Sequence, residues 1–286
     1  MIAAVQTAPT RVAYEQIERR ASIAETDFSR LYKARNQPLV ITDAARNWRA
    51  LAAWNFEFFR SRYGATEVTC SRYDGQWYQG ANTRQMLLGD FIDGILSQDW
   101  KSFPYYIRDY YSLFEQHPEL LADCPIPAYF FDWFGRAPAF MRRPGPRLFV
   151  GPAGAITPFH SDIWGTHAWM TQIVGRKRWI LISPDQARCL GPRISKPGAL
   201  PRYAIDPADP DFARTPEFGG AHPVEATIGA GEAIFVPGGW FHHVVSIDPT
   251  VSLTGNFMGP GCFWPVLPNA VNDLVIKRVA AVFRSA

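Results

Sequence analysis

The stretch GEAIFVPGGWFHHVVSI, residues 231–247, contains two short β-type runs separated by a Pro-Gly-Gly turn. Proline lacks a backbone donor and glycine readily adopts turn conformations, so this combination ends a strand. Short runs of β-branched and aromatic residues bounded by such turns predict antiparallel strands. The stretch therefore predicts two consecutive strands, with a close pair of histidines, His242 and His243, at the start of the second.

The same pattern of short β-type runs and turn residues extends from residue 147 to residue 257. Further short β-type runs, separated by glycine and proline, are RLFVG, AWMTQIV, RWILIS and VSLTGNF. Many short strands with turn signals are typical of an antiparallel sandwich or barrel. Residues 184–228 are rich in Pro, Gly, Arg and Asp and interrupt the pattern, so we expect a long insertion there, either a functional lid or binding loop or an ordinary surface loop.

The remainder of the chain mixes helical and strand patterns. Ser22 and Glu25 fit a capping box, which predicts a helix that ends before Pro38. Other expected elements are strands at 39–42, 65–72 and 104–109, helices at 54–63 and 85–96, and a short helix at 117–123. Helical spacing of Val271, Leu274, Val275, Val279 and Val282 predicts a C-terminal helix within 261–286. A chain of 286 residues fits one large, mainly β domain, 1–286, with these additions.

Composition argues against several classes of protein. The formal net charge is only +3 and charges of both signs are interspersed, so the composition gives no argument for a nucleic-acid-binding protein. The four cysteines, Cys70, Cys124, Cys189 and Cys262, are far apart and predict free thiols in a reducing cytosol. The N-terminus lacks a secretory pattern and no run approaches about 18 apolar residues, so we expect a soluble, cytoplasmic protein without a membrane span.

A second pair of histidines occurs in TPFHSDIWGTHAW, residues 157–169. His160 and Asp162 are two residues apart, so on a strand their side chains share a face and can point at one ion. A histidine from a distant strand would complete a 2-His-1-carboxylate triad, which leaves positions of an octahedral Fe(II) open. Either His242 or His243 can supply it, but adjacent strand residues face opposite ways, so only one is expected to bind.

Several other catalytic motifs are absent from the chain. HExxH, CxxC, GxSxG, GxGxxG and the phosphate-binding P-loop do not occur. Zinc held by two histidines and one aspartate, as in hydrolases, stays open as an alternative.

Taken together, TPFHSD, GRKRWILISP, GEAIFVPGGWFHHV and TGNF resemble, in order and spacing, the JmjC-type Fe(II)- and 2-oxoglutarate-dependent oxygenases, in particular their cupin-like hydroxylase branch. The segments FSRLYKARNQPLVITDAARNW and PYYIRD resemble the region that precedes the barrel in these enzymes. The resemblance covers roughly residues 22–260 and implies a double-stranded β-helix (cupin or jelly-roll) core at 146–260. A mixed α/β region at 1–145 would precede this core, and a C-terminal helix would follow it.

The resemblance also assigns roles to residues at matching positions. His160, Asp162 and His242 match the iron ligands, because in the family the distal ligand directly follows the G-W-aromatic step. Lys177, in GRKRW, matches the lysine that pairs with the distal carboxylate of 2-oxoglutarate. The further residues that match the cosubstrate pocket are Thr157, Tyr106, Thr254 and Asn256.

One position departs from the family pattern. Met170 stands where related hydroxylases often have asparagine, which puts the hydrogen bonding around the cosubstrate in doubt. His167 is expected to line the pocket or to be a structural residue. His243 is expected either to form a hydrogen bond that supports the metal ligands or to lie in the core. Trp164 and Trp169 either line the substrate entrance or serve as packing.

The activity implied by the resemblance is hydroxylation of a C–H bond by Fe(II), 2-oxoglutarate and O2, with succinate and CO2 as coproducts. The expected substrate is a protein or peptide side chain, an amino acid or a small natural product. An N-methyl demethylase, a tRNA-base hydroxylase, a non-catalytic cupin binding module and a zinc hydrolase are the alternatives. Relatives often dimerise through C-terminal helices, so a homodimer is expected.

Overall fold

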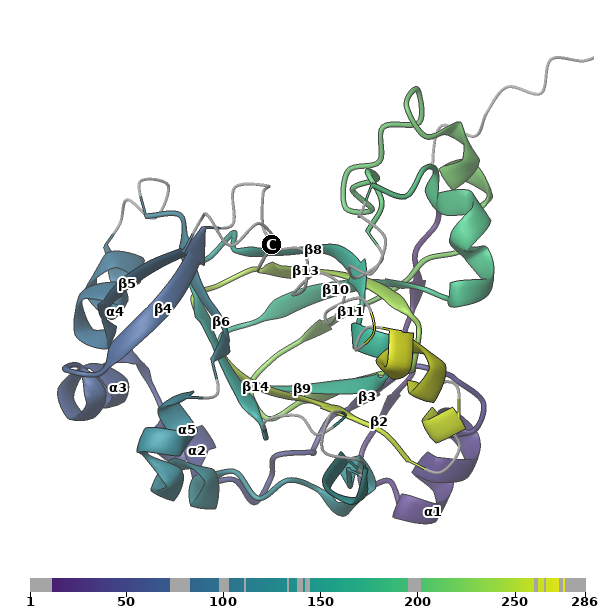
Figure 1. Ribbon diagram of the computed structural model, residues 1–286. Coiled ribbons are helices and arrows are strands. Elements are labelled where there is room, and N and C mark those ends of the chain that lie inside the picture. The colour runs from purple at the N-terminus through teal and green to yellow at the C-terminus, as the bar shows by residue number, and fades with distance from the viewer. Residues whose placement is uncertain are drawn as a thin grey trace, which may run out of the picture.

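Two β-sheets of unequal size face each other and form the core of the molecule (Figure 1). A computed structural model describes residues 12–72, 83–97, 103–110, 112–132, 134–137, 141, 145–194, 202–259, 262–264, 266–272 and 275, without the side chains of residues 109 and 110. Within these residues, no helix is both long enough and apolar enough to cross a membrane.

Eight strands from the β-rich part of the chain form the core of both sheets. They are β7 (Arg147–Gly151), β8 (Ile156–Ser161), β9 (His167–Val174), β10 (Lys177–Ile182), β11 (Val224–Ile228), β12 (Ala233–Val236), β13 (Phe241–Ser246) and β14 (Thr250–Phe257). The order β11-β10-β13-β8 lies in one sheet and β12-β9-β14-β7 in the other, and all of these neighbours are antiparallel. Because the chain passes repeatedly from one sheet to the other, this is the predicted double-stranded β-helix.

Strands from the N-terminal half extend these sheets rather than forming a separate layer. Next to β7 lie β6 (Tyr105–Tyr110), β4 (Glu67–Arg72) and β5 (Thr83–Leu87), and next to β12 lie β3 (Leu39–Ile41) and β2 (Arg19–Arg20). The short β1 (Glu15–Gln16) adds to β11 in the other sheet. The larger sheet thus has nine strands and the smaller sheet five.

Helices cover the outer face of the nine-stranded sheet. They are α1 (Glu25–Asp27), which continues as a π-helical segment (Phe28–Lys33), α2 (Ala50–Ala53), α3 (Phe56–Tyr63), α4 (Leu88–Leu96) and α5 (Ser112–Gln116). Phe28, Phe59 and Phe91 from this layer join Trp169 and Leu253 of the sheet in one buried cluster. Burial of such aromatic side chains is the main reason that the layer stays on the sheet.

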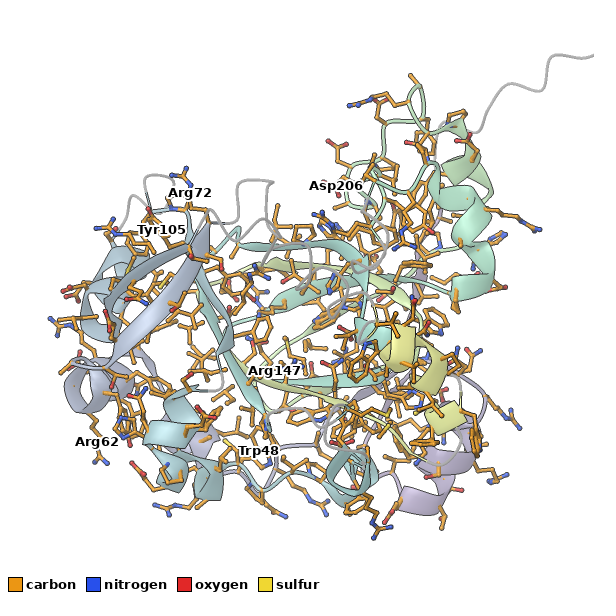
Figure 2. All side chains as sticks on the ribbon, in the orientation of Figure 1. Trp48, Arg62, Arg72, Tyr105, Arg147 and Asp206 are labelled. Carbon is orange, nitrogen blue, oxygen red and sulfur yellow. The ribbon has the colours of Figure 1, made fainter. Side chains whose placement is uncertain are left out.

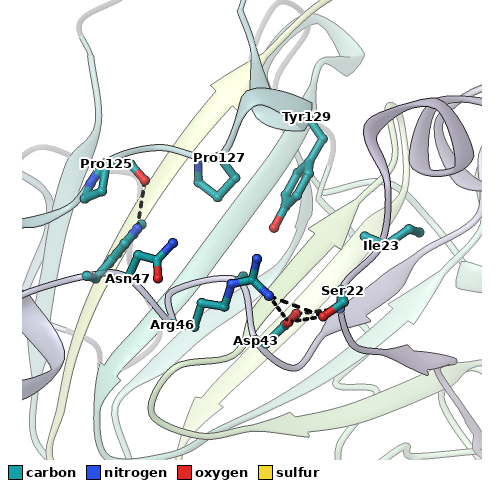
Figure 3. A pocket seen from close by; sticks show the side chains of 10 residues that line it. Ser22, Ile23, Asp43, Arg46, Asn47, Pro125, Pro127 and Tyr129 are labelled. Carbon is teal, nitrogen blue, oxygen red and sulfur yellow. Dashed lines mark hydrogen bonds and ion pairs between the residues drawn. The ribbon is translucent and has the colours of Figure 1, made fainter.

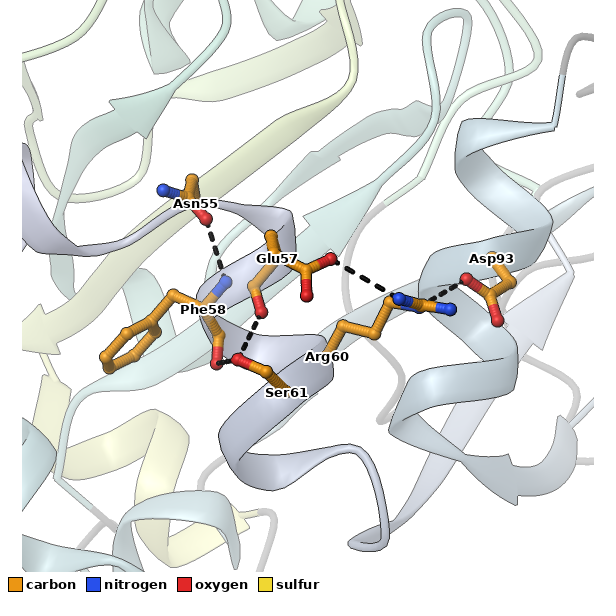
Figure 4. A network of polar contacts seen from close by, with 6 residues as sticks. All are labelled: Asn55, Glu57, Phe58, Arg60, Ser61 and Asp93. Atoms are coloured by element: carbon orange, nitrogen blue, oxygen red, sulfur yellow. Dashed lines mark hydrogen bonds and ion pairs between the residues drawn. The ribbon is translucent and has the colours of Figure 1, made fainter.

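Helices α3 and α4 are fixed at their surfaces by polar contacts (Figure 4). The Asn55 side chain caps α3 by accepting a hydrogen bond from the Phe58 amide at 2.8 Å. Arg60 of α3 donates to Asp93 of α4 at 2.7 Å. The cap contributes about 1 kcal/mol and the exposed ion pair less than that, so packing dominates here.

The insertion packs on the outer face of the five-stranded sheet. Its 3-10 turns, Pro184–Leu190 and Pro216–Gly220, bury Leu190 and Phe218 against Phe241 of β13. It ends earlier than predicted, because residues 224–228 form β11. The segment projects at the upper right of Figure 1, yet its Arg202 backbone forms a β-bridge with His160.

The C-terminal segment is helical at residues 262–264, 266–272 and 275. Val266 and Ala270 are buried against Trp164 and Met258. Val271 and Val275, from the predicted apolar stripe, are instead 43% and 53% exposed. The predicted helix is confirmed over its described part, but these two valines do not form the face that packs on the barrel.

Two local predictions are wrong. Ser22 does not cap a helix, because its amide and hydroxyl both donate to Asp43 and the helix begins at Glu25 instead. Residues 85–87 belong to β5 and not to the following helix. In both cases pairing with residues distant in sequence overrides the local pattern.

Candidate metal and cosubstrate site

The structure brings His160, Asp162 and His242 together between the sheets. Strands β8 and β13 are antiparallel neighbours, and His160 lies directly opposite His242 in their register. Opposed residues point to the same face, so the two rings meet with centroids 4.3 Å apart. One ligand atom from each of the three residues lies within 4.8 Å of the others, which is close enough for one ion.

Hydrogen bonds to the backbone orient both imidazoles. Nδ1 of His160 lies 2.8 Å from the carbonyl oxygen of Pro158, and Nδ1 of His242 lies 3.4 Å from that of Trp240. A proton on each Nδ1 leaves each Nε2 with a lone pair for a metal. Burial, and then the neighbouring His242, lowers the pKa of His160 well below its ordinary value, which keeps this imidazole neutral and able to bind a cation.

Asp162 comes directly after β8, in extended backbone, so it continues the strand alternation that begins at His160. Its carboxylate lies 3.9 Å from Nε2 of His160. The chain then turns at Trp164, which has φ 57°, a conformation uncommon for residues other than glycine. Asn269 of the C-terminal helix donates a hydrogen bond to the carbonyl of Trp164 at 3.1 Å, so the helix supports this turn.

His243 points to the opposite face of β13 and away from the triad. It lies opposite Ile180 in the register with β10, and its ring is buried beneath the insertion. Its Nε2 lies 3.8 Å from a carboxylate oxygen of Asp206, a residue of the insertion that is labelled in Figure 2. The alternation of strand side chains therefore makes His242 the member of the pair that faces His160 and Asp162.

Lys177 is fully buried on the inner face of the same sheet. Its ammonium donates to the hydroxyl oxygen of Tyr106 at 2.9 Å and lies over the rings of Tyr106 and Phe149. Across the described ranges, no carboxylate lies at ion-pair distance from it, and burial lowers the pKa of the ammonium to about 7. A buried cation is costly without an anion, so this position suits a ligand that brings a carboxylate.

The remaining predicted cosubstrate residues fall into two groups. Thr157 lies opposite Val244, which places its hydroxyl on the inner face, where Tyr106 also lies. Thr254 instead donates its hydroxyl proton to the carbonyl of Trp169, and Asn256 bonds to Arg147 and Thr166. The hydroxyl proton of Thr254 and the amide oxygen of Asn256 are thus already engaged within the protein.

Met170 lies on the inner face, with its sulfur 3.8 Å from the ammonium nitrogen of Lys177. A thioether accepts hydrogen bonds only weakly and cannot donate one. The position where the family often has an amide therefore contributes an apolar wall beside Lys177.

Two arginines near the site were missed by sequence reasoning. Arg108 is close enough to His160 to help lower the pKa of that histidine. Arg147, which is labelled in Figure 2, donates a hydrogen bond to the side-chain oxygen of Asn256. Arg108 is two residues beyond Tyr106 on the same strand, so strand alternation would have placed both on one face. No comparable signal pointed to Arg147.

His167 does not line the pocket. It lies on the outer face of the nine-stranded sheet, with its ring packed against Phe235 and Phe257. Its Nδ1 accepts a hydrogen bond from the amide of Gly238 at 2.8 Å. Of the two predicted readings, the structural one is confirmed and the pocket-wall reading is wrong. Trp169 likewise packs outward, stacked on Phe130 with ring centroids 5.3 Å apart.

A separate cavity of about 240 Å³ lies between residues 22–48 and residues 125–129 (Figure 3). Its polar wall holds the Asp43 carboxylate, which accepts from Ser22 and Arg46, and its other wall holds Pro127 and Tyr129. Burial raises the pKa of Tyr129 to about 12. None of the predicted site residues lines this cavity.

Two imidazole nitrogens and one carboxylate oxygen are donors that suit Fe(II), and in a facial arrangement they leave room for other ligands. The residues present thus fit both groups that the sequence predicts. The triad fits the metal, and Lys177 with Tyr106 and Thr157 fits an anionic cosubstrate.

Comparison with known proteins gives a consistent result. Residues 25–260 match the family model described as the cupin-like domain. The chain is 31% identical over 277 residues to the human 2-oxoglutarate and iron-dependent oxygenase JMJD4, covering 89% of this chain and 63% of that protein. It is 31% identical over 239 residues to the bifunctional arginine demethylase and lysyl-hydroxylase psr-1 of Caenorhabditis elegans, covering 81% of this chain and 58% of that protein.

A third similar protein is the lysine-specific demethylase JMJ21 of Arabidopsis thaliana, with 31% identity over 258 residues. The match covers 85% of this chain but only 25% of that protein. The chain thus spans less than two thirds of each of these relatives. Since the family model covers most of the chain and the strand order is that of a jelly roll, the chain belongs to the cupin-like domain family.

Proposed function

We propose that this chain is an Fe(II)- and 2-oxoglutarate-dependent oxygenase that hydroxylates a C–H bond of a protein or peptide side chain. The observation that carries the proposal is the group His160, Asp162 and His242, whose ligand atoms lie within 4.8 Å of one another between the two sheets. The names of two relatives, an iron-dependent oxygenase and a lysyl-hydroxylase, support the same reaction class.

Fe(II) and 2-oxoglutarate, when bound, supply O2 activation, with oxidative decarboxylation of the cosubstrate to succinate and CO2. The chain supplies positions for the reactants. His160, Asp162 and His242 would hold the metal on one face. The ammonium of Lys177 and the hydroxyl of Tyr106 would hold the distal carboxylate of the cosubstrate, and the hydroxyl of Thr157 lies on the same inner face.

The apolar walls around Lys177 would keep water away from the carboxylate of a bound cosubstrate. Phe149, Met170 and Trp179 belong to the buried cluster between the sheets and contribute no charged group. In such an apolar environment an ammonium–carboxylate pair is stronger than in water. This supports Lys177 as the anchor of a dianion whose other end chelates the metal.

A zinc hydrolase accounts for the triad but not for the buried ammonium. Hydrolysis of a bound substrate by metal-activated water needs no such anion site beside the metal. In a non-catalytic cupin module, neither the triad nor the buried ammonium would have a function. Lys177 therefore favours the oxygenase over both alternatives.

The substrate class rests on the relatives. The names of two of them, the lysine-specific demethylase JMJ21 and the bifunctional arginine demethylase and lysyl-hydroxylase psr-1, refer to lysine or arginine, which are side chains of proteins. A peptidyl substrate is therefore preferred over a free amino acid, a small natural product or a tRNA base. Demethylation of an N-methyl group would begin with the same hydroxylation, so it is a second outcome of the same test.

The test is turnover of a peptide library rich in lysine, arginine and their N-methylated forms, with Fe(II), 2-oxoglutarate and O2. The expected result is succinate formation coupled to a gain of one oxygen atom in a peptide, without formaldehyde. Loss of a methylene group together with formaldehyde would show demethylation instead. Turnover that is indifferent to O2, or that persists after each triad residue is replaced by alanine, would show that the proposal is wrong.

Two further predictions concern the protein as a whole. We infer a homodimer through the C-terminal helix, supported by the exposure of three large apolar side chains of the C-terminal segment, Trp264, Val271 and Val275. Light scattering of wild type and of Val271→Glu checks it, since the substitution should leave a monomer. The cytoplasmic location stays a prediction from the cysteine pattern.

A further inference from the structure

The two turns next to the metal-ligand residues lie backbone against backbone. One follows Asp162 and contains Gly165 at φ 76°, and the other precedes His242 and contains Gly239 at φ 80°. A Cβ atom on Gly238 would lie 2.5 Å from the carbonyl oxygen of Gly165. Only glycine allows this approach, because a side chain at position 238 would collide with the other turn.

A single imidazole joins these turns. The amide of Gly238 donates to Nδ1 of His167 at 2.8 Å. His167 is the fifth residue after Asp162, and Gly238 is the fourth residue before His242. The hydrogen bond thus connects the segment that follows Asp162 with the segment that precedes His242, although the bonded residues are 71 positions apart in the chain.

The imidazole is held in place for this contact. Its ring packs between Phe235 and Phe257, at centroid distances of 5.5 and 5.2 Å, and it is 5% exposed. To accept at Nδ1, the ring must carry its proton on Nε2, because a doubly protonated imidazole has no lone pair. Without this imidazole the partly buried amide of Gly238 would lose the acceptor that the structure gives it, which is costly for a donor shielded from water.

We propose that His167 is a positioning residue of the metal centre, which fixes the turn from which His242 projects by accepting from the Gly238 amide. The proposal rests on the proposed function, since it concerns the same metal. Replacing a residue that orients the metal ligands without binding the metal typically lowers metal affinity by roughly 10- to 100-fold. His167 contacts the turn and not the ligand itself, so we expect an effect of about tenfold.

Three substitutions at one position separate the hydrogen bond from packing. Asparagine places its carbonyl oxygen close to the position of the histidine Nδ1, glutamine carries the same group farther out, near the position of Nε2, and leucine has no acceptor. His167→Asn should therefore retain the bond to Gly238, whereas His167→Gln and His167→Leu should lose it. Thr171→Val is the matched control, because Thr171 is also buried, also faces outward on β9, and does not contact Gly238.

The measurement is Mn(II) affinity, followed by the loss of the free-ion EPR signal, on protein without cosubstrate. Wild type, His167→Asn and Thr171→Val should bind with affinities within about threefold of one another, and the other two variants should bind about tenfold more weakly. Near-ultraviolet circular dichroism of the metal-free proteins checks folding. If the leucine variant does not fold, the comparison of asparagine with glutamine still decides the question.

The outcomes are distinguishable. If wild type bound no Mn(II), the proposed function would be wrong, and the role of His167 with it. If wild type bound Mn(II) and His167→Gln bound it equally well, only the role of His167 would be wrong. Equal weakening in Thr171→Val would also overturn it, because any buried change on the outer face would then have the same effect.

Discussion

The ammonium of Lys177 lies 2.9 Å from the hydroxyl oxygen of Tyr106, and within the part of the chain that the structure describes no carboxylate accompanies it. Burial lowers the pKa of Lys177 to about 7, below its ordinary value of 10.5. Between these values the unfolded chain binds more protons than the folded protein, so the free energy of unfolding rises with pH. Without ligands, it should increase by about 2 kcal/mol from pH 7 to pH 8.5 through this group alone.

Urea unfolding of the metal-free protein at these two pH values tests the prediction, with Lys177→Met as the comparison. The variant lacks the ionisable group, so its stability should lack this part of the rise with pH. The pH range of the experiment ends at 8.5, below the ordinary pKa of cysteine. Burial raises the pKa of the Cys70 thiol to about 12, so at higher pH this thiol lowers the free energy of unfolding and would mask the effect of Lys177. An equal rise in both proteins would contradict the assignment of a low pKa to Lys177.

The same substitution should weaken cosubstrate binding. Truncating one partner of a buried ion pair costs about 2–5 kcal/mol, which corresponds to a loss of 2-oxoglutarate affinity of about 30-fold or more. Calorimetric titration of 2-oxoglutarate into Mn(II)-loaded protein measures it. Mn(II) affinity itself should stay unchanged, which separates the anchor from the metal ligands.

The two adjacent histidines of β13 should behave oppositely toward metal. His242→Ala removes a residue that faces His160 and Asp162, and Mn(II) binding should fall by at least about tenfold. His243→Leu changes a ring on the other face, beneath the insertion, and should keep Mn(II) affinity within about threefold. A larger loss of affinity in the His243 variant than in the His242 variant would reverse the ligand assignment.

The close approach of the two turns predicts an effect of a single methyl group. Gly238→Ala would place Cβ 2.5 Å from the carbonyl oxygen of Gly165, so one turn must move. We expect the free energy of unfolding to fall by about 1–3 kcal/mol, together with weaker Mn(II) binding. Gly229→Ala is the control, because its Cβ would meet only the flexible Arg176 side chain at 3.8 Å. Equal effects of the two substitutions would contradict this account.

Much of the fold is predictable because its signals are local. Pro-Gly-Gly before Trp240, and glycine or proline between the other β-type runs, end the strands where the structure ends them. The two-residue step from His160 to Asp162 places both on one face for the same local reason. The predictions fail where partners distant in sequence decide, as for Ser22, whose hydroxyl donates to Asp43 instead of capping a helix.

The role of His167 shows the same limit within the site. Its position two residues before Trp169 reveals the face of the strand but not the partner. That partner, the Gly238 amide, is 71 residues away and becomes a neighbour only when β12 pairs with β9. The pairing of Asn256 with Arg147, 109 residues apart, is hidden from sequence reasoning for the same reason.

The fold should lose stability in mild acid through the buried imidazole of His167. Burial, with a smaller effect of the Lys33 ammonium, lowers the pKa of His167 to about 4 from its ordinary 6.5. As the pH falls below 6.5 the unfolded chain takes up a proton that folded His167 does not. The free energy of unfolding therefore falls by about 1.5 kcal/mol between pH 6.5 and pH 5 through this group.

The comparison is His167→Asn, which retains the acceptor but does not titrate. Over the same pH range its free energy of unfolding should fall by about 1.5 kcal/mol less than that of the wild type. Parallel urea unfolding curves at the two pH values measure the difference, and the carboxylates and the other buried histidines cancel because both proteins contain them. Identical losses in the two proteins would show that His167 accepts a proton in the folded state as readily as in the unfolded chain.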